Sequence, residues 1–258
     1  MLKYRILTAL VLIPLVFAFI FYMPPLPFVL VLFALILLCG WEWVQLIPLK
    51  KYAYFFPLLL AVANFLAYRY PDAFVISGAA LWLLMIFAIF SFPKTQHYWG
   101  KPTVLMILGW VFMPLCFVSL TYLHLFYRGN TLFVYLLLLV WASDTGAYIA
   151  GKYFGKRRLI PAVSPNKTWA GLIGGVALAA AVSCAAFVYF GSNNATLWAI
   201  QAAATVFMAT IGDLFISMLK RRVHCKDTGH LLPGHGGLLD RLDSLIAAAP
   251  CFCILIGG

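Results

Sequence analysis

Long apolar runs, separated by short polar or charged segments, dominate this chain. A helix needs about 20 apolar residues to cross a hydrocarbon core of about 30 Å. Nine runs approach that length and predict transmembrane helices over residues 6–22, 28–46, 54–68, 74–92, 104–126, 132–150, 169–190, 195–216 and 239–258. We therefore expect an all-α polytopic membrane protein with about nine spans.

The composition supports a bilayer location. Hydrophobic residues make up 65% of the 258 residues and charged residues 10%, against roughly 45–50% and 25% in soluble domains. A water-soluble enzyme, a disordered chain and a nucleic-acid-binding arm are excluded, because none of them hides so much apolar surface from water. The net charge of +11 is therefore interpreted through membrane topology and anionic ligands, and we expect no nucleic-acid partner.

The basic residues test the number of spans. If the spans alternate, 16 of the 18 basic residues fall on one side, leaving Arg69 and Arg128 on the other. The positive-inside rule then predicts a cytoplasmic N-terminus and a periplasmic C-terminus. The first apolar run is followed by no cleavage-site pattern and is interpreted as a retained helix. The ninth span has a short purely apolar part, residues 245–256: either it enters the bilayer partway or the chain stops early.

The spans divide the chain into two regions. Residues 1–130 hold five predicted spans, and residues 131–258 hold four, which we expect to form the catalytic region. The two longest connections, 151–168 and 220–238, are both predicted to be cytoplasmic. Function is therefore expected on that face.

Acidic residues are few and unevenly placed. Only seven are present. Glu42 fits an interfacial position between two tryptophans, and Asp72 lies in a predicted outer loop. The remaining five belong to the last four spans and their inner loops: Asp144, Asp213, Asp227, Asp240 and Asp243.

Three of these carboxylates predict a metal site. Asp240 and Asp243 share a helix face at the start of the ninth span, while Asp213 lies near the inner end of the eighth. Carboxylates converging in a partly dry pocket repel one another unless a cation lies between them, and oxygen ligands suit Mg2+. The alternative is a set of structural ion pairs with Lys220 and Arg241.

The connection after the eighth span combines cations with a glycine turn. It carries Lys-Arg-Arg at 220–222, Lys226 and Asp227, and then Pro-Gly-His-Gly-Gly at 233–237. With a metal nearby, this composition indicates a polyphosphate site, although each part alone is typical of a topology signal or an ordinary turn. Four histidine and cysteine residues of this connection could bind zinc: His224, Cys225, His230 and His235. Zinc is the weaker alternative, because their spacing matches no common zinc finger.

The other inner connection ends in Ser-Pro-Asn-Lys-Thr at 164–168. Thr168 or Asn166 is suited to cap the following helix, whose N-terminus would offer amides to an anion beside Lys167. The alternative is an ordinary cap with an interfacial lysine.

The region from the end of the eighth span to the start of the ninth resembles a known family. The motif is carried by Ser217, Lys220, Arg221, Lys226, Asp227, Gly229, Pro233, Gly234, His235, Gly236, Gly237, Asp240, Arg241, Asp243 and Ser244. At these spacings it resembles the signature of the bacterial phosphatidate cytidylyltransferases, or CDP-diacylglycerol synthases. The resemblance extends to Trp-Glu-Trp at 41–43, Trp-Ala-Ser-Asp-Thr-Gly-Ala-Tyr at 141–148 and the 164–168 segment, although the chain ends sooner after Cys253 than relatives do.

The resemblance implies an activity and a set of site residues. The reaction would be CTP plus phosphatidate giving CDP-diacylglycerol and pyrophosphate for phospholipid biosynthesis. It would depend on Mg2+, with or without a second cation, in a multi-pass and often homodimeric protein of the bacterial inner membrane whose site faces the cytoplasm. Metal ligands would be Asp213, Asp240 and Asp243; catalysis would further involve Lys226 and Asp227, the latter as ligand or as a residue orienting Lys226. Substrate binding would involve Ser164, Asn166, Lys167, Thr168, Asp144, Ser217, Lys220, Arg221, His235, Gly236, Gly237 and Arg241.

Other functions are less consistent with the sequence. A related CTP-dependent enzyme acting on another lipid phosphate or alcohol is the main alternative. A proton-coupled transporter would carry acids near the midplane of both halves, whereas here they gather in one half. A CDP-alcohol phosphotransferase would carry an Asp-Gly-X-X-Ala-Arg motif, which the sequence lacks.

Overall fold

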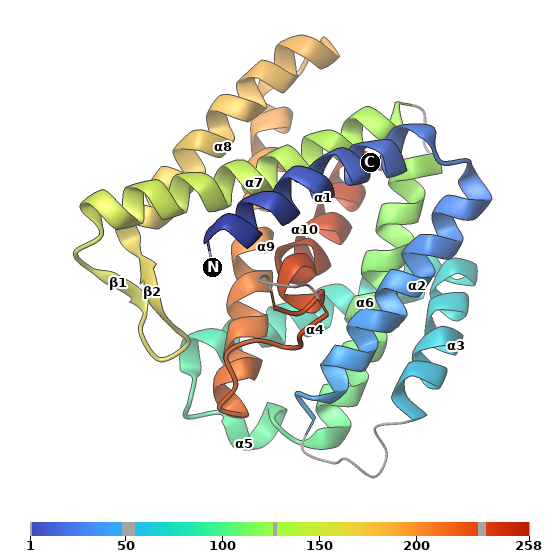
Figure 1. The fold of residues 1–258 in the computed structure, drawn as a ribbon, viewed down its shortest axis with the longest axis vertical. Coiled ribbons are helices and arrows are strands. Elements are labelled where there is room, and N and C mark those ends of the chain that lie inside the picture. The colour runs from blue at the N-terminus through green and yellow to red at the C-terminus, as the bar shows by residue number, and fades with distance from the viewer. Residues whose placement is uncertain (1, 48–54, 126–127, 232–235, 258) are drawn as a thin grey trace.

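The computed structural model describes residues 2–47, 55–125, 128–231 and 236–257, and only the backbone for residues 2–9 and 257. The described chain is a helical bundle with one short β-hairpin (Figure 1). Its elements are α1 (Leu2–Tyr22), α2 (Pro25–Val44), α3 (Phe55–Arg69), α4 (Pro71–Ser91), α5 (Gln96–Trp99), α6 (Pro102–Leu125), α7 (Gly129–Phe154), β1 (Arg158–Ile160), β2 (Ser164–Thr168), α8 (Trp169–Phe190), α9 (Ala195–Arg222) and α10 (Leu239–Gly257).

Helix starts follow local sequence signals. Pro25, Pro71 and Pro102 each occupy the first position of a helix, where the missing N–H costs nothing and the fixed φ suits the helix. Asn194 caps α9, because its Oδ1 accepts a hydrogen bond from Leu197 N at 2.9 Å. The short connections therefore end one helix and begin the next within a few residues.

Six described helices are long and apolar enough to cross a bilayer: α2, α4, α6, α7, α8 and α9. They confirm a polytopic membrane protein. The other three predicted spans are also helices, but α3 has only 15 residues, about 23 Å at helical rise, and α10 opens with charged residues. In α1 the apolar stretch with described side chains is Leu10–Tyr22. The number nine and the orientation of the termini stay predictions.

The inner connections differ from the sequence prediction. Helix α7 continues to Phe154 and α9 to Arg222, so Lys220 and Arg221 lie on a helix and not in a loop. The all-α prediction is wrong for β1 and β2, which pair antiparallel with Arg158 opposite Thr168. Hydropathy reports where lipid contact ends, whereas lysine and arginine sustain a helix beyond that point.

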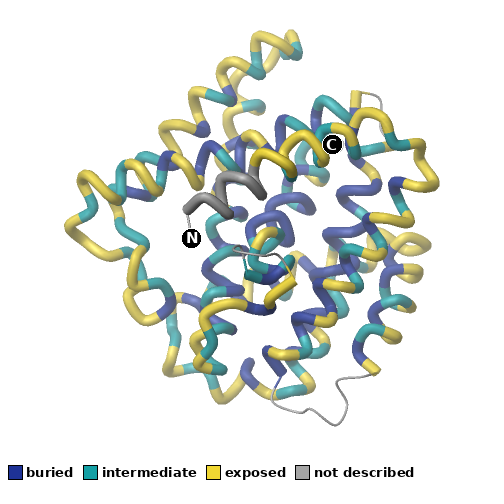
Figure 2. The backbone as a smooth tube through the Cα atoms, in the orientation of Figure 1, coloured by how far each residue is buried: buried dark blue, intermediate teal, exposed yellow. Residues whose placement is uncertain are grey.

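The core lies along α6, α9 and α10. More than half of the apolar windows of α6 and α9 is buried, and so is every residue from 245 to 249 of α10 (Figure 2). Helix α8 instead contacts α7 through one stripe, since its buried positions are Gly171, Gly175, Ala179 and Ser183. The small residues of this stripe allow a close helix approach, and the rest of α8 is largely exposed.

Two arginines bring several connections to one end of the bundle. Arg222, the last residue of α9, donates to the carbonyls of Leu46 and Gly100. The neighbouring Arg221 Nε donates to Val163 O of the hairpin turn at 3.3 Å. The segments after α2, α5 and α7 therefore meet the end of α9.

Candidate active site

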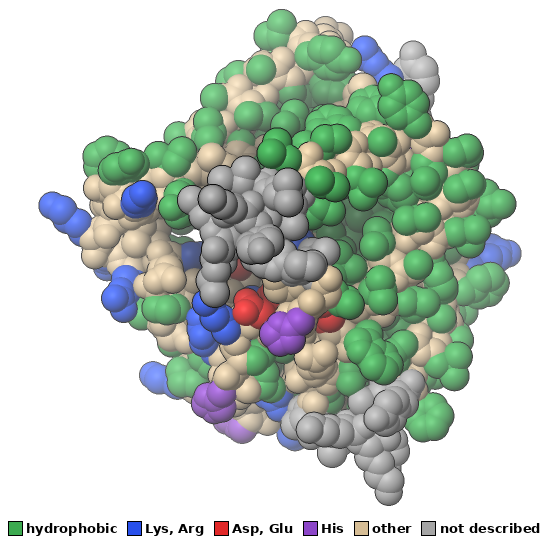
Figure 3. All heavy atoms as spheres, in the orientation of Figure 1, with side chains coloured by type: hydrophobic (Ala, Val, Ile, Leu, Met, Phe, Trp, Pro, Cys, Tyr) green, Lys and Arg blue, Asp and Glu red, His purple; other side chains and the backbone are tan. Residues whose placement is uncertain are grey.

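Charged side chains from four elements converge at this end of the bundle. Figure 3 shows blue basic side chains gathered near the hairpin, while hydrophobic side chains cover much of the rest of the same face. The candidate site draws on α7, the β-hairpin, α9 with its following loop, and the first turns of α10. Two segments that the sequence separates, 164–168 and 213–243, therefore contribute to one site.

A close crossing of α9 and α10 places two carboxylates together. A Cβ at Gly212 would collide with the backbone oxygen of Asp243, so only glycine lets the helices approach this far. Asp213 follows directly on α9. Asp243 interacts electrostatically with Asp213 and with Asp144 of α7. Asp144, Asp213 and Asp243 thus form a carboxylate cluster. The sequence predicted Asp144 as a substrate-binding residue, whereas the structure places it beside two of the predicted metal ligands.

Lysine from the hairpin reaches this cluster. Lys167 Nζ lies 2.6 Å from Asp213 Oδ2, and both side chains are 27% exposed. The Ser217 hydroxyl donates to Asp213 Oδ1 at 3.2 Å from one turn further along α9. The structure therefore brings together Lys167, Asp213 and Ser217 as the sequence predicted.

Asp240 has a different environment. Its Oδ1 lies 2.6 Å from Lys220 Nζ, with side-chain exposures of 6% and 14% for aspartate and lysine. Its Oδ2 accepts from Thr228 N at 2.8 Å, from Thr228 Oγ1 at 3.0 Å and from Gly237 N at 3.2 Å. Both oxygens are thus engaged by protein donors, which matches the structural ion pair considered above. Metal ligation by Asp240 stays a prediction.

The donor chemistry of the carboxylate cluster suits a hard cation. Within the described ranges no group of three His, Cys, Asp or Glu side chains is arranged around a single metal position. Asp144, Asp213 and Asp243 nevertheless repel one another, and carboxylate oxygens are the ligands that Mg2+ prefers. Lys167 and Arg241 offset part of this repulsion at Asp144.

The loop after α9 is exposed where phosphates could reach it. Lys226 and Asp227 are both exposed. A Cβ on Gly236, whose φ is 84°, would be 3.4 Å from Asp227 Cβ, so the two ends of the loop lie close. His235, which the sequence predicts to bind substrate, lies outside the described residues. Partial burial raises the pKa of the Cys225 thiol, so this cysteine is protonated at neutral pH.

The 164–168 segment has two roles in the structure. Thr168 caps α8, since its Oγ1 accepts from Gly171 N at 3.1 Å. Ser164 is half-buried and Asn166 is exposed, and Asn166 is not the cap. The segment is therefore both a helix cap and, through Lys167, part of the charged site.

Glu42 is the main residue that sequence reasoning missed. It was expected at the membrane interface, yet it is only 1% exposed. Its carboxylate accepts hydrogen bonds from the backbone N–H groups of Leu238 and Leu239 at the start of α10. The Trp-Glu-Trp segment in the family resemblance was the one signal that could have found it.

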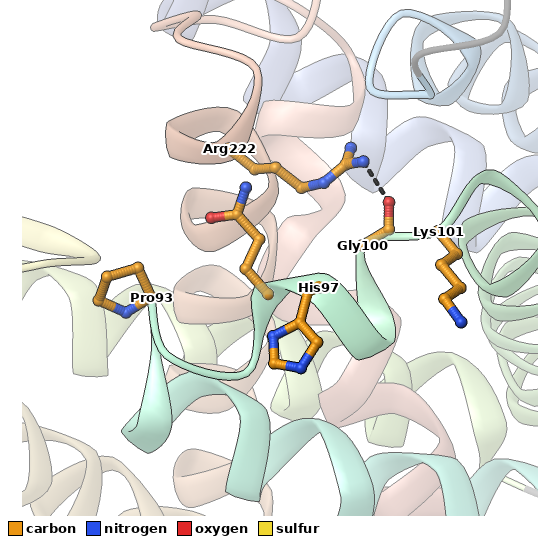
Figure 4. A pocket seen from close by; sticks show the side chains of 6 residues that line it. Pro93, His97, Gly100, Lys101 and Arg222 are labelled. Atoms are coloured by element: carbon orange, nitrogen blue, oxygen red, sulfur yellow. Dashed lines mark hydrogen bonds between the residues drawn. The ribbon is translucent and has the colours of Figure 1, made fainter.

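A separate polar cavity of about 380 Å3 lies beside α5. Figure 4 shows Arg222 reaching from α9 to the Gly100 carbonyl at its wall. The lining consists of Pro93, Gln96, His97, Gly100, Lys101 and Arg222. The cavity includes no predicted site residue, and its basic lining adds to the positive charge at this end.

Comparison with known proteins now decides the family. A sequence model of the cytidylyltransferase family matches residues 3–257. The chain belongs to the cytidylyltransferase family. As a family member, this cytidylyltransferase is a nucleotidyltransferase enzyme, which confirms the enzyme class predicted from the sequence.

Curated relatives match this cytidylyltransferase along its length. A phosphatidate cytidylyltransferase of Haemophilus influenzae is 39% identical over 98% of this chain and 97% of its own. Another protein of that name, from Pseudomonas aeruginosa, is 38% identical over 99% of this chain and 97% of its own. A third, from Rickettsia felis, is 39% identical over 56% of this chain and 67% of its own. The resemblance stated from the motifs is confirmed.

Proposed function

We propose that this chain transfers the cytidylyl group of CTP to phosphatidate, giving CDP-diacylglycerol and pyrophosphate. The shared name of its full-length relatives supports this reaction. The structural observation that carries it is the ion pair of Lys167 with Asp213 of α9, beside Asp144 of α7 and Asp243 of α10, at one end of the bundle. Cations and hard-metal ligands side by side are what a nucleoside triphosphate requires.

The reaction needs no protein nucleophile. A phosphate oxygen of phosphatidate attacks the α-phosphorus of CTP and forms the new P–O bond. The bond from the α-phosphorus to the oxygen bridging the β-phosphate breaks, and pyrophosphate leaves with that electron pair. The protein must hold two polyanions in line and neutralise their charge.

Basic residues supply that neutralisation in our proposal. Lys226 is exposed on the loop, and Lys167 reaches the cluster from the hairpin; both would bind phosphate oxygens. Arg221 commits its Nε to Val163 O, and its terminal nitrogens would contact the triphosphate. Lys220 is engaged by Asp240, so its contribution is to hold that carboxylate and to add positive charge near Asp243.

The carboxylate cluster would hold the metal. Asp213 and Asp243, with Asp144 nearby, fit a hard cation by their oxygen donors and mutual repulsion. We therefore propose that Mg2+ binds there, with or without a second cation. When bound, Mg2+ would neutralise charge on the triphosphate and polarise its α-phosphate.

We further propose nine spans in the bacterial inner membrane, with a cytoplasmic N-terminus and active site and a periplasmic C-terminus. The grouping of basic connections at one end supports this orientation. A cysteine at Ser192, between α8 and α9, should react with an impermeant reagent in intact cells, and Cys225 should not. The opposite labelling pattern would overturn the orientation.

We also propose that the protein forms a homodimer. The family resemblance supports this, and the largely exposed surface of α8 leaves an apolar face for contact. The protein mass measured in detergent, after subtraction of bound detergent, distinguishes a dimer from a monomer.

Transfer of label from CTP to lipid tests the reaction directly. Purified protein with Mg2+ and CTP labelled in its α-phosphate should produce labelled lipid only with phosphatidate, with equal release of pyrophosphate. Asp213→Asn is the matched control and should give background counts. Label transferred equally well to diacylglycerol or to another lipid phosphate would instead support the related enzyme considered above.

A further inference from the structure

Glu42 is a buried carboxylate inside an otherwise apolar helix end. It lies in the last turn of α2 and is 1% exposed, between Trp41 and the fully buried Trp43. Trp43 Nε1 donates to Leu105 O at 3.1 Å, which fixes this turn against α6. A carboxylate in such a place is costly unless several donors satisfy it.

Those donors come from the far end of the sequence. Glu42 Oε1 accepts from Leu238 N at 3.0 Å, and Oε2 accepts from Leu239 N at 2.8 Å. The Leu238 carbonyl accepts the first helical bonds of α10, from Arg241 N and Leu242 N. Glu42 therefore caps α10 from another helix, where its negative charge also favours the positive end of the helix dipole.

The loop backbone closes tightly around this carboxylate. A Cβ on Gly229 would lie 2.7 Å from Glu42 Cδ, and one on Gly237 would lie 2.5 Å from Glu42 Oε2. Neither contact leaves room for a side chain, so these two glycines are required by the approach to Glu42. Asp227 and Lys226 lie two and three residues before Gly229, and Gly236 directly precedes Gly237.

One hydroxyl links Glu42 to Asp240. Thr228 Oγ1 lies 3.2 Å from Glu42 Oε2 and 3.0 Å from Asp240 Oδ2. Asp240 in turn pairs with Lys220. A continuous chain of polar contacts therefore runs from α2 through the loop to α9 and α10, the helices that bear Asp213 and Asp243.

We propose that Glu42 is a positioning residue for nucleotidyl transfer, which holds the described parts of the loop, residues 223–231 and 236–238, and the N-terminal end of α10 in place. This inference rests on the proposed function. Because Glu42 is shielded from solvent, it would act through the loop and not by touching substrate. Its removal would misplace Lys226, Asp227 and the first turn of α10 together.

Glu42→Gln tests the proposal with little change in volume. A glutamine has one acceptor oxygen, so its amino group would face the N–H of Leu238 or Leu239. We expect kcat/KM for CTP to fall about ten- to hundredfold, while the unfolding temperature of the detergent-solubilised protein stays within a few degrees of wild type. Labelling of Cys225, which lies half-buried in this loop, should become several times faster. Asp72→Asn, at an exposed site in the first turn of α4, is the control and should change neither readout.

A second variant reaches the same contact from the loop. Gly229→Ala keeps the carboxylate but pushes the loop away from it, and should reproduce both changes. Because both substitutions break one contact, the double variant should lose little more activity than either single variant. This variant carries the test if Glu42→Gln does not fold.

The outcomes separate the two proposals. If wild type transfers label to phosphatidate but folded Glu42→Gln keeps kcat/KM and Cys225 labelling within about twofold of wild type, the positioning role is wrong. If wild type does not use phosphatidate, the proposed function fails, while faster Cys225 labelling in Glu42→Gln would still support the role of Glu42 in holding the described part of the loop in place.

Discussion

Two ion pairs of equal length in the candidate site differ in their contact with solvent. Lys167 and Asp213 lie 2.6 Å apart with 27% of each side chain exposed. Lys220 and Asp240 are also 2.6 Å apart, but are only 14% and 6% exposed. Exposed pairs contribute about 0–1 kcal/mol to stability, whereas loss of one partner from a buried pair costs about 3–5 kcal/mol.

The two aspartates also differ in their other partners. Asp240 accepts from Thr228 and Gly237 as well as from lysine, while the Ser217 hydroxyl donates to Asp213. The first pair to exchange partners when a polyanion binds should therefore be Lys167 with Asp213. The same residue types thus have two roles: Lys220 and Asp240 stabilise the fold, whereas Lys167 and Asp213 are placed to exchange partners with a ligand.

The largest expected effect is that of Asp240→Asn. It leaves Lys220 buried without its carboxylate and weakens the acceptor for three loop donors, so we expect about 3–5 kcal/mol of lost stability together with lost turnover. Thermal unfolding and cytidylyl transfer measure the two effects. Adding Lys220→Met to Asp240→Asn should recover stability but not turnover. If Asp240→Asn alone unfolds at the same temperature as wild type, the buried pair does not stabilise the fold.

Asp213→Asn should separate activity from stability. We expect turnover to fall about hundredfold or more, as for a lost group that stabilises the transition state, with a stability change below about 1 kcal/mol. Asp243→Asn should show a similar loss of turnover. The measurements are kcat at saturating Mg2+ and the unfolding temperature, and near-normal kcat would remove the residue from the site.

Lys167→Ala should have a smaller effect on the reaction. Loss of a charge-assisted contact to phosphate corresponds to about 1.5–3 kcal/mol, or about ten- to hundredfold in kcat/KM for CTP. Lys167→Arg should rescue poorly if the site requires a compact point charge. Values for Lys167→Ala within about twofold of wild type would reduce the 164–168 segment to its capping role.

The smallest expected effect is that of Lys226→Ala. This lysine is exposed, so its contact with phosphate would be partly screened, and we expect about a tenfold or smaller loss in kcat/KM for CTP. The loss should diminish as salt rises. A loss that does not depend on salt would indicate a role for Lys226 other than charge.

The apolar pattern predicted the helices better than it predicted their ends. Runs of apolar residues specify bilayer contact, so α2, α4 and α6 were predictable from length alone. The extension of α9 to Arg222 was not, because the helix continues where lipid contact ends. The sequence did not predict the hairpin either, because its polar residues are typical of a loop. Its turn is held by a long-range contact, in which Arg221 Nε donates to Val163 O.

The candidate site was predictable where its residues lie close in sequence. The spacing of Asp240 and Asp243 predicts that they share one helix, and a pairing of Asp240 with Lys220 is the alternative that the sequence offers. The role of Glu42 depends on contacts with residues 196 and 197 positions away, which no local pattern encodes. Asp144 joins the cluster by the packing of α7, which is equally long-range.

The β-hairpin gives the site a segment that should open and close locally, faster than the helices around it. A two-stranded hairpin is at best marginally stable on its own, and this one carries Lys167 to Asp213 on paired strands of three and five residues. Its amide hydrogens should exchange with deuterium sooner than those of α9, which is buried along much of its length. The lifetime of the Lys167–Asp213 contact would then follow local opening of the hairpin, and bound CTP should slow exchange over residues 158–168.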